Sequence, residues 1–178
     1  FLMGGTLDIS VTSADVKALR CDAAMLISNA VINIDCAASA SGSKAIKADG
    51  DLAVLLGEIN VTTECPGLYD TAKSNMTYCV AIKSEGNINI KGGTFKLKST
   101  GSDSKGISAD GDIVIDGGEF KITATGESNE GMEAKKQLTI NDGSFTINAY
   151  DDCINAKSNL FIKGGTVIGT SKMNDGLD

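Results

Sequence analysis

The segment Ala109-Asp-Gly-Asp-Ile-Val-Ile-Asp-Gly-Gly-Glu-Phe-Lys-Ile122 contains two short runs in which apolar and polar residues alternate. Ile113 and Ile115 carry the first run, Phe120 and Ile122 carry the second, and a Gly-Gly pair separates them. Alternation over so few residues is typical of short β-strands, and paired glycines are typical of a bend between strands. One such unit cannot bury its apolar face alone, so copies of it have to cover one another.

The same unit recurs along the whole chain at a nearly constant period. The apolar residues that open successive copies are separated by 27, 36, 25, 25, 22 and 23 positions. The spacing of 36 contains one insertion, at about residues 63–79. A period of 22 to 27 residues without a helical pattern predicts three short strands per turn of a parallel β-helix. The opening residues are Leu19, Ile46, Ile82, Ile107, Met132, Ile154 and Leu177.

Stacking the turns places side chains of the same kind above one another. Phe95, Phe120 and Phe145 fall in one column, and mostly aliphatic residues fill the others. Adjacent strands are expected about 4.8 Å apart, and connections between parallel strands are nearly always right-handed. The sequence therefore predicts an all-β protein: a right-handed, single-stranded parallel β-helix of about seven turns that forms one domain over residues 1–178. Because both ends of the sequence fall inside a repeat, we expect a fragment of a longer, secreted chain.

The bends between strands have a sequence pattern of their own. An acidic residue followed by glycine recurs at one bend, and a pair ending in glycine recurs at the other. Because glycine tolerates positive φ, we expect positive-φ corners at both bends, with the acidic residues as turn formers. The first set is Asp49-Gly50, Glu85-Gly86 and Asp110-Gly111, and the second is Gly92-Gly93, Gly117-Gly118, Asp142-Gly143 and Gly164-Gly165.

The composition argues against several classes of function. A net charge of −7 disfavours nucleic acid and anionic membranes as partners. No apolar run approaches the roughly 18 residues of a membrane-spanning helix. Histidine is absent, which removes the commonest general base and the commonest zinc ligand. Tryptophan is absent too, so an aromatic platform for sugars would have to use Tyr69, Tyr78 or Tyr150.

The five cysteines do not follow Cys-x-x-Cys spacing. Cys21, Cys36 and Cys153 fall on apolar or small-residue positions, where we expect buried free thiols. Cys65 and Cys79 flank the insertion, and a disulfide between them is expected if the protein is exported.

Polar residues beside the opening apolar residues form outer rows that change from basic to acidic toward the C-terminus. Carboxylates one strand spacing apart repel each other unless a cation or water intervenes. Oxygen ligands on adjacent turns suit Ca²⁺, so the acidic end predicts a calcium site, with a solvated acidic face as the alternative. The predicted ligands are Glu130, Asp151, Asp152 and Asp175, with Glu133 and Asp178 as second choices.

The basic end of the same rows is a weaker candidate, for binding acidic sugars or sulfates. Arg20, Lys47 and Lys83 lie there, and Tyr150 is the aromatic residue that we add to this set. A solvated lysine face is the alternative interpretation.

Four motifs carry a resemblance to a known family: Ser108 to Ile122, Asn129-Glu-Gly-Met-Glu-Ala-Lys135, Tyr150-Asp-Asp-Cys-Ile-Asn-Ala156 and Asn174-Asp-Gly-Leu177. They resemble the bacterial carbohydrate-binding parallel β-helices, formerly a domain of unknown function. The resemblance implies a polysaccharide-lyase-like topology, bound calcium, an extracellular or cell-surface location, and affinity for plant-type or acidic polysaccharides. By position, the family's acidic motif corresponds to Asn129-Glu130-Gly131, Asp151-Asp152-Cys153 and Asn174-Asp175-Gly176.

These observations favour a non-catalytic carbohydrate-binding module that recognises a polysaccharide or oligosaccharide. One alternative is a structural stalk or adhesin that displays a neighbouring domain. The other is a pectate-lyase-like enzyme, which needs calcium and a basic side chain at the C5 proton of the sugar. Exposed terminal turns also make end-to-end self-association an expectation.

Overall fold

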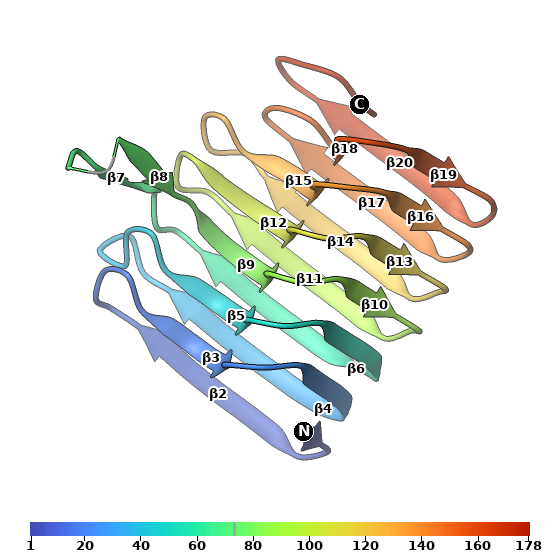
Figure 1. Ribbon diagram of the computed structural model, residues 1–178, viewed down its shortest axis with the longest axis horizontal. Helices are drawn as coiled ribbons and strands as arrows, with labels where there is room; N and C mark the ends of the chain where they lie inside the picture. Colours follow the sequence, from blue (N-terminus) through green and yellow to red (C-terminus); the bar gives the residue numbers. More distant parts are fainter. Residues whose placement is uncertain (73) are drawn as a thin grey trace.

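The structure, a computed structural model, describes residues 1–72 and 74–178 as a parallel β-solenoid of about seven turns (Figure 1). No residue in this part of the chain is helical, and none of it could therefore cross a bilayer as a helix. A six-stranded parallel sheet forms one face of the coil, and a twelve-stranded sheet covers the other two. We call them the first, second and third face. The predicted all-β, parallel architecture is confirmed.

Each face collects equivalent strands from successive turns. The first face contains β3 (Lys17–Cys21), β5 (Lys44–Ala48), β9 (Cys79–Ser84), β12 (Ser104–Ala109), β15 (Glu130–Ala134) and β18 (Ile154–Ala156). The second contains β1 (Leu2–Met3), the first halves of β4 (Met25–Cys36) and β6 (Leu52–Thr63), β10 (Ile88–Ile90), β13 (Ile113–Ile115), β16 (Leu138–Ile140) and β19 (Leu160–Ile162). The third contains β2 (Thr6–Val11), the second halves of β4 and β6, β11 (Thr94–Ser99), β14 (Glu119–Ala124), β17 (Ser144–Ala149) and β20 (Thr166–Ser171).

The strand register matches the predicted columns on all three faces. Ile107 pairs with Met132 on the first face and Ile88 with Ile113 on the second. On the third, the rings of Phe95, Phe120 and Phe145 stack with centroids 4.5 Å apart and planes within 6° of parallel. All three rings are at most 1 % exposed, so the column is the centre of a continuous apolar core inside the coil.

The prediction of positive φ is confirmed at one bend and wrong at the other. Between the second and third faces, Gly93, Gly118, Gly143 and Gly165 have φ between 81° and 127°. At the other bend, Gly50, Gly86 and Gly111 do not take positive φ. Close stacking requires glycine there instead, because a Cβ on Gly111 would lie 2.9 Å from the carbonyl oxygen of Gly86 on the neighbouring turn.

The insertion forms an antiparallel hairpin that projects from the coil (Figure 1). Its strands are β7 (Leu68–Asp70) and β8 (Asn75–Thr77). A disulfide between the buried Cys65 and Cys79 joins the two ends of the insertion, which is the pairing that their flanking positions suggested. The expectation of buried thiols holds for Cys36 and Cys153 but is wrong for Cys21, which is only partly buried because β3 is the terminal strand of its sheet.

Candidate carbohydrate and metal sites

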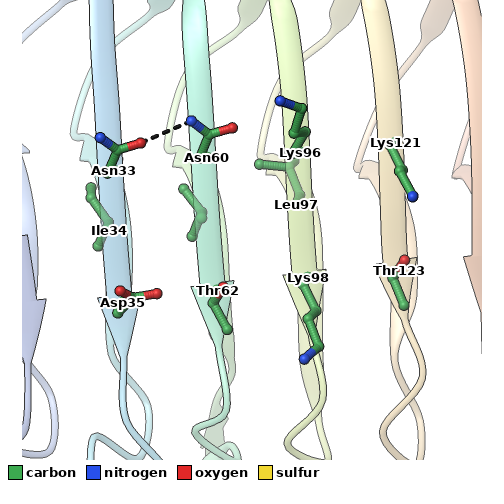
Figure 2. A pocket seen from close by; sticks show the side chains of 11 residues that line it. Asn33, Ile34, Asp35, Asn60, Thr62, Lys96, Leu97, Lys98, Lys121 and Thr123 are labelled. Atoms are coloured by element: carbon green, nitrogen blue, oxygen red, sulfur yellow. Dashed lines mark hydrogen bonds between the residues drawn. The ribbon is translucent and has the colours of Figure 1, made fainter. Parts of the chain in front are cut away.

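A shallow groove of about 560 Å³ runs across the third face, over β4, β6, β11 and β14 (Figure 2). Residues between the inward columns point outward in each strand, and here they are polar: β11 alternates buried Phe95 and Leu97 with exposed Lys96 and Lys98. Stacking the turns brings these outward side chains together from four strands. The polar side chains that line the groove are Asn33, Asp35, Asn60, Thr62, Lys96, Lys98, Lys121 and Thr123.

An amide ladder forms the first part of this groove. Asn33 donates from Nδ2 to Asp8 Oδ1 over 2.6 Å, and Asn60 donates from Nδ2 to Asn33 Oδ1 over 2.8 Å (Figure 2). The ladder fixes the orientation of both amides. It leaves Asn60 Oδ1 buried and without a hydrogen-bond partner among the described residues. Because this oxygen is buried, it is an unsatisfied acceptor beneath the groove and is not exposed to a ligand.

Three lysines form the second part of the groove. Lys96 lies 3.2 Å from Glu58 Oε1, and the pKa of the Glu58 carboxyl is lowered by hydrogen bonds from Asn60 and Lys96. Lys98 and Lys121 are exposed and form no ion pair with the described residues. Lys96 and Lys121 are direct neighbours across the β11–β14 pair, but Lys96 turns toward Glu58 on β6 and Lys121 points the other way (Figure 2).

Glu130, Asp151 and Asp152 form a cluster of carboxylates on adjacent turns near β15 and β18. One oxygen from each lies within 4.8 Å of the others. Burial raises the pKa of the Glu130 carboxyl. Burial, followed by the charge of Asp151, raises the pKa of the Asp152 carboxyl. The structure thus brings together three of the four predicted first-choice ligands.

Asn155 lies against this cluster and has one unsatisfied polar atom. It is 2 % exposed and donates from Nδ2 to Asp152 Oδ2 over 2.8 Å. Its Oδ1 atom is buried and has no hydrogen-bond partner in the described part of the chain. A buried acceptor without a donor costs free energy, and a cation would satisfy it. The oxygen-rich composition of the cluster fits Ca²⁺.

The remaining predicted metal ligands lie nearby with other contacts. The Glu133 carboxylate lies 2.8 Å from the ammonium group of Lys105, which also lies 2.8 Å from Glu130. Asp175 reaches the cluster through its backbone N–H, which donates to Asp152 Oδ1 over 3.2 Å, and its side chain is exposed. Asp178 is exposed and pairs with Ile154 and Ala156 through its backbone.

Arg20, Lys47 and Lys83 of the predicted sugar-binding set are register neighbours on β3, β5 and β9, but each of them already pairs with carboxylates. Arg20 pairs with Asp22 and Asp49, and Lys47 pairs with Asp49 and Glu85. Lys83 lies 2.6 Å from Asp110 and lines a different hollow, described below. Tyr150 lies apart from them, with the ammonium group of Lys172 over its ring at 4.8 Å.

Neutralising Asp152 tests whether the cluster binds a cation. In calcium-free buffer at pH 7, the Asp152→Asn variant should be at least as stable as the wild type, because one of three crowded charges is gone and Asn155 can rotate to pair its free oxygen. The pKa of the Asp152 carboxyl is raised in the folded wild type, so the wild type loses stability as the pH rises through that pKa. The advantage of the variant should therefore vanish below about pH 4, where aspartate is protonated in both states.

Calcium should make the wild type more stable than the Asp152→Asn variant, which reverses their order of stability in calcium-free buffer. At about 100 times its dissociation constant it should stabilise the wild type by about 2.7 kcal/mol, and the variant by much less. Urea unfolding with and without calcium measures both effects. An equal response of the two proteins to calcium would contradict the metal assignment.

These features define the class of the protein: a parallel β-solenoid that presents a polar, partly cationic groove on one face and a cluster of carboxylates beside another. Residues 1–176 match the family model described as carbohydrate-binding domain-containing protein. The chain belongs to this carbohydrate-binding family, which confirms the family expected from the motifs. No curated protein and no solved structure matches the chain.

Proposed function

We propose that the chain is a non-catalytic carbohydrate-binding module that holds an acidic polysaccharide along the groove of the third face. The groove itself carries this proposal: the unpaired ammonium groups of Lys98 and Lys121 lie with the polar residues Asn33 and Asn60 on adjacent turns of a chain from a carbohydrate-binding family. Ammonium groups attract carboxylates, and amides exchange hydrogen bonds with hydroxyl groups.

The geometry of the groove favours an extended, charged ligand. Its polar side chains recur from turn to turn at about 4.8 Å along the coil axis, so they can contact successive units of a regular polymer. No aromatic side chain is among the residues that line the groove. Recognition then rests on charge and hydrogen bonds rather than on stacking against sugar rings. This combination suits a uronate-containing, plant-type polysaccharide in solution better than a flat crystalline surface.

Calcium is part of the proposal. Glu130, Asp151 and Asp152 would hold the ion, and the Asn155 oxygen would join them after its amide rotates, since Nδ2 now faces Asp152. The ion would neutralise carboxylates that burial penalises and would tie adjacent turns of the coil together. The Cys65–Cys79 disulfide supports an extracellular or cell-surface location, since such bonds persist in oxidising compartments.

A polysaccharide lyase is the enzymatic alternative, and one observation bears on it. The base in β-elimination must be neutral and must lie near the metal. Lys105 lies beside the acidic cluster, but the charges of Glu130 and Glu133 outweigh its burial and raise its pKa, which makes it a poor base. Lys44 has a pKa lowered to about 8 by burial, but three pairing steps separate it from Glu130, roughly 14 Å at the usual strand spacing.

Binding to polygalacturonate tests the proposal. The double variant Lys98→Ala, Lys121→Ala should lose at least about tenfold in affinity, because each lysine offers a charge-assisted hydrogen bond. Lys136→Ala, Lys163→Ala is a matched control, since both lysines are exposed and lie outside the groove. Added salt should weaken binding to the wild type more than to the groove variant.

Three outcomes would count against this function. Equal affinity of the groove variant and the control would remove the groove as the binding surface. Steady production of an unsaturated, ultraviolet-absorbing product from polygalacturonate and calcium would favour the lyase. Absence of binding to any glycan, with or without calcium, would favour the stalk or adhesin, for which the exposed apolar Met3 and Leu177 near opposite ends of the coil support end-to-end association.

A further inference from the structure

A second hollow, of about 400 Å³, lies between the hairpin and the first face. Strands β5, β8, β9, β12 and β15 contribute to its lining. The hairpin wall is held in place at its base: the buried Cys65–Cys79 disulfide joins its ends, and Gly42 donates its backbone N–H to the Pro66 carbonyl over 2.9 Å. The hollow is therefore a built feature of the insertion and lies on a different face from the groove.

Lys44 is the unusual residue of this hollow. It is 9 % exposed, and its ammonium group donates to the Gly42 carbonyl over 2.7 Å. No carboxylate of the described residues lies within ion-pairing distance of it. A buried cation is normally paired, because desolvation penalises its charged form. Lys44 is thus a buried cation without a negatively charged partner among the described residues.

Neighbouring charges destabilise the Lys44 cation further. Lys17 on β3, Lys47 on β5 and Lys83 on β9 act on it as like charges, and Asp15 opposes them. Burial, followed by the charge of Lys17, lowers the pKa of Lys44 to about 8. The charged groups near it are therefore mainly positive, in a chain whose net charge is −7.

The carboxylates of the hollow are already shared among its other cations. Asp110 lies 2.6 Å from both Lys83 and Lys135. Glu133 lies 2.8 Å from Lys105, whose ammonium group also lies over the ring of Tyr78 at 4.5 Å. Four lysines and two acidic residues line the hollow, and Glu130 pairs with Lys105 from beside it, so four cations face three carboxylates. The hydroxyl of Ser108 is also among its lining groups.

We propose that this hollow is an anion subsite in which Lys44 binds one carboxylate or sulfate group of a sugar residue. The sugar part of this inference rests on the proposed function, whereas the anion part does not. The hollow is smaller than the groove, and the hairpin closes one side of it. The hollow suits a single charged sugar unit at the end or at a branch of a polysaccharide, whereas the groove suits the interior of a polysaccharide chain. The insertion then adds selectivity for charged glycans to the module.

Calorimetry of the full chain with galacturonic acid, 6-sulfated galactose and neutral galactose tests the subsite. Lys44→Met should weaken binding of the charged sugars by roughly 10- to 100-fold, the loss typical of a hydrogen bond to a charged group. It should leave the fold intact, because it removes an unpaired buried charge. Lys47→Met is the matched control on the same strand, since Lys47 already pairs with Asp49 and Glu85. Whichever charged sugar binds more tightly identifies the preferred anion.

A second readout follows the Lys44 ammonium group directly, by NMR of the ¹³C-dimethylated protein. A bound anion should raise the pKa of Lys44 above 8, and affinity should fall as the pH rises through that pKa. An unchanged Lys44 pKa, together with equal affinity of Lys44→Met and wild type for the charged sugars, would overturn the subsite.

The subsite and the proposed function can fail separately. If the Lys44 pKa rises with inorganic sulfate while no sugar binds anywhere, the anion site stands and its sugar ligand is overturned. If polygalacturonate binds in the groove but Lys44 responds to neither sugars nor sulfate, the function stands and the subsite is overturned.

Discussion

Replacing Lys105 by methionine is expected to destabilise the protein by about 3–5 kcal/mol at neutral pH. The Lys105 side chain is 7 % exposed and pairs with Glu130 and Glu133, which are 12 % and 9 % exposed. Removing the cation leaves two carboxylates of low exposure without a counter-charge. This loss is much larger than that expected for a solvent-exposed pair such as Lys96–Glu58.

The pH dependence of the Lys105→Met variant identifies the cause of its instability. Without Lys105, the pKa of the Glu130 carboxyl in the folded state should rise further, so the variant should regain stability as the pH falls and Glu130 is protonated. The triple variant Lys105→Met, Glu130→Gln, Glu133→Gln should recover most of the loss at pH 7. Urea unfolding at pH 4 and pH 7 measures both effects. A Lys105→Met protein as stable as the wild type at pH 7 would contradict the importance of this ion cluster.

Replacing Phe120 by alanine is expected to cost about 3–5 kcal/mol, the usual loss for a large aromatic side chain in a core. Phe120 is 1 % exposed and stacks between Phe95 and Phe145, so its removal leaves a cavity and ends both ring contacts. Phe120→Leu should cost less, because more of the volume remains filled. Glu119→Ala, at the exposed neighbouring position, should change stability by no more than about 0.5 kcal/mol.

The same series tests whether the solenoid behaves as a stack of turns. In repeat proteins each turn contacts only its neighbours, so a weakened central turn can separate the unfolding of the two ends. Urea unfolding of Phe120→Ala should therefore show a lower midpoint and a broader transition. A loss below about 1 kcal/mol would contradict the close stacking of the three rings.

The inside of the coil was predictable because its geometry allows few choices. Successive turns lie one strand spacing apart, so each inward position must match the volume of its neighbours above and below. The sequence expresses this as columns of like residues, of which Phe95, Phe120 and Phe145 are the plainest. The observed register reproduces them. The acidic cluster was predictable from the same register, since Glu130 and Asp152 occupy equivalent positions on adjacent turns.

The outer surfaces were less predictable, because a side chain there can reach several partners. Lys105 belongs by sequence to the basic half of its row, yet it pairs in register with Glu130 and neutralises part of the acidic half. Lys98 and Lys121 are not among the predicted site residues, because the predicted basic row lies on the first face and they lie on the third. Their signal was present, however, in the alternation of lysine with Leu97 and Ile122 on the third face.

The hairpin and its hollow could not be predicted from the repeat. The insertion breaks the period, and its strands are three residues long, too short for an alternation pattern to define them. Only the flanking Cys65 and Cys79 indicated that its ends meet. The isolation of Lys44 from carboxylates depends on how the hairpin folds against the first face, which the columns do not specify.

The most direct test of the proposed function is an NMR titration of the ¹⁵N-labelled protein with a galacturonate oligomer. If the groove of the third face binds acidic polysaccharide, the saturable shift changes should include Asn60, Lys98 and Lys121, and they should be much weaker with a neutral oligomer of the same length. A spectrum in which these three residues do not respond, whatever happens elsewhere in the molecule, would contradict the account.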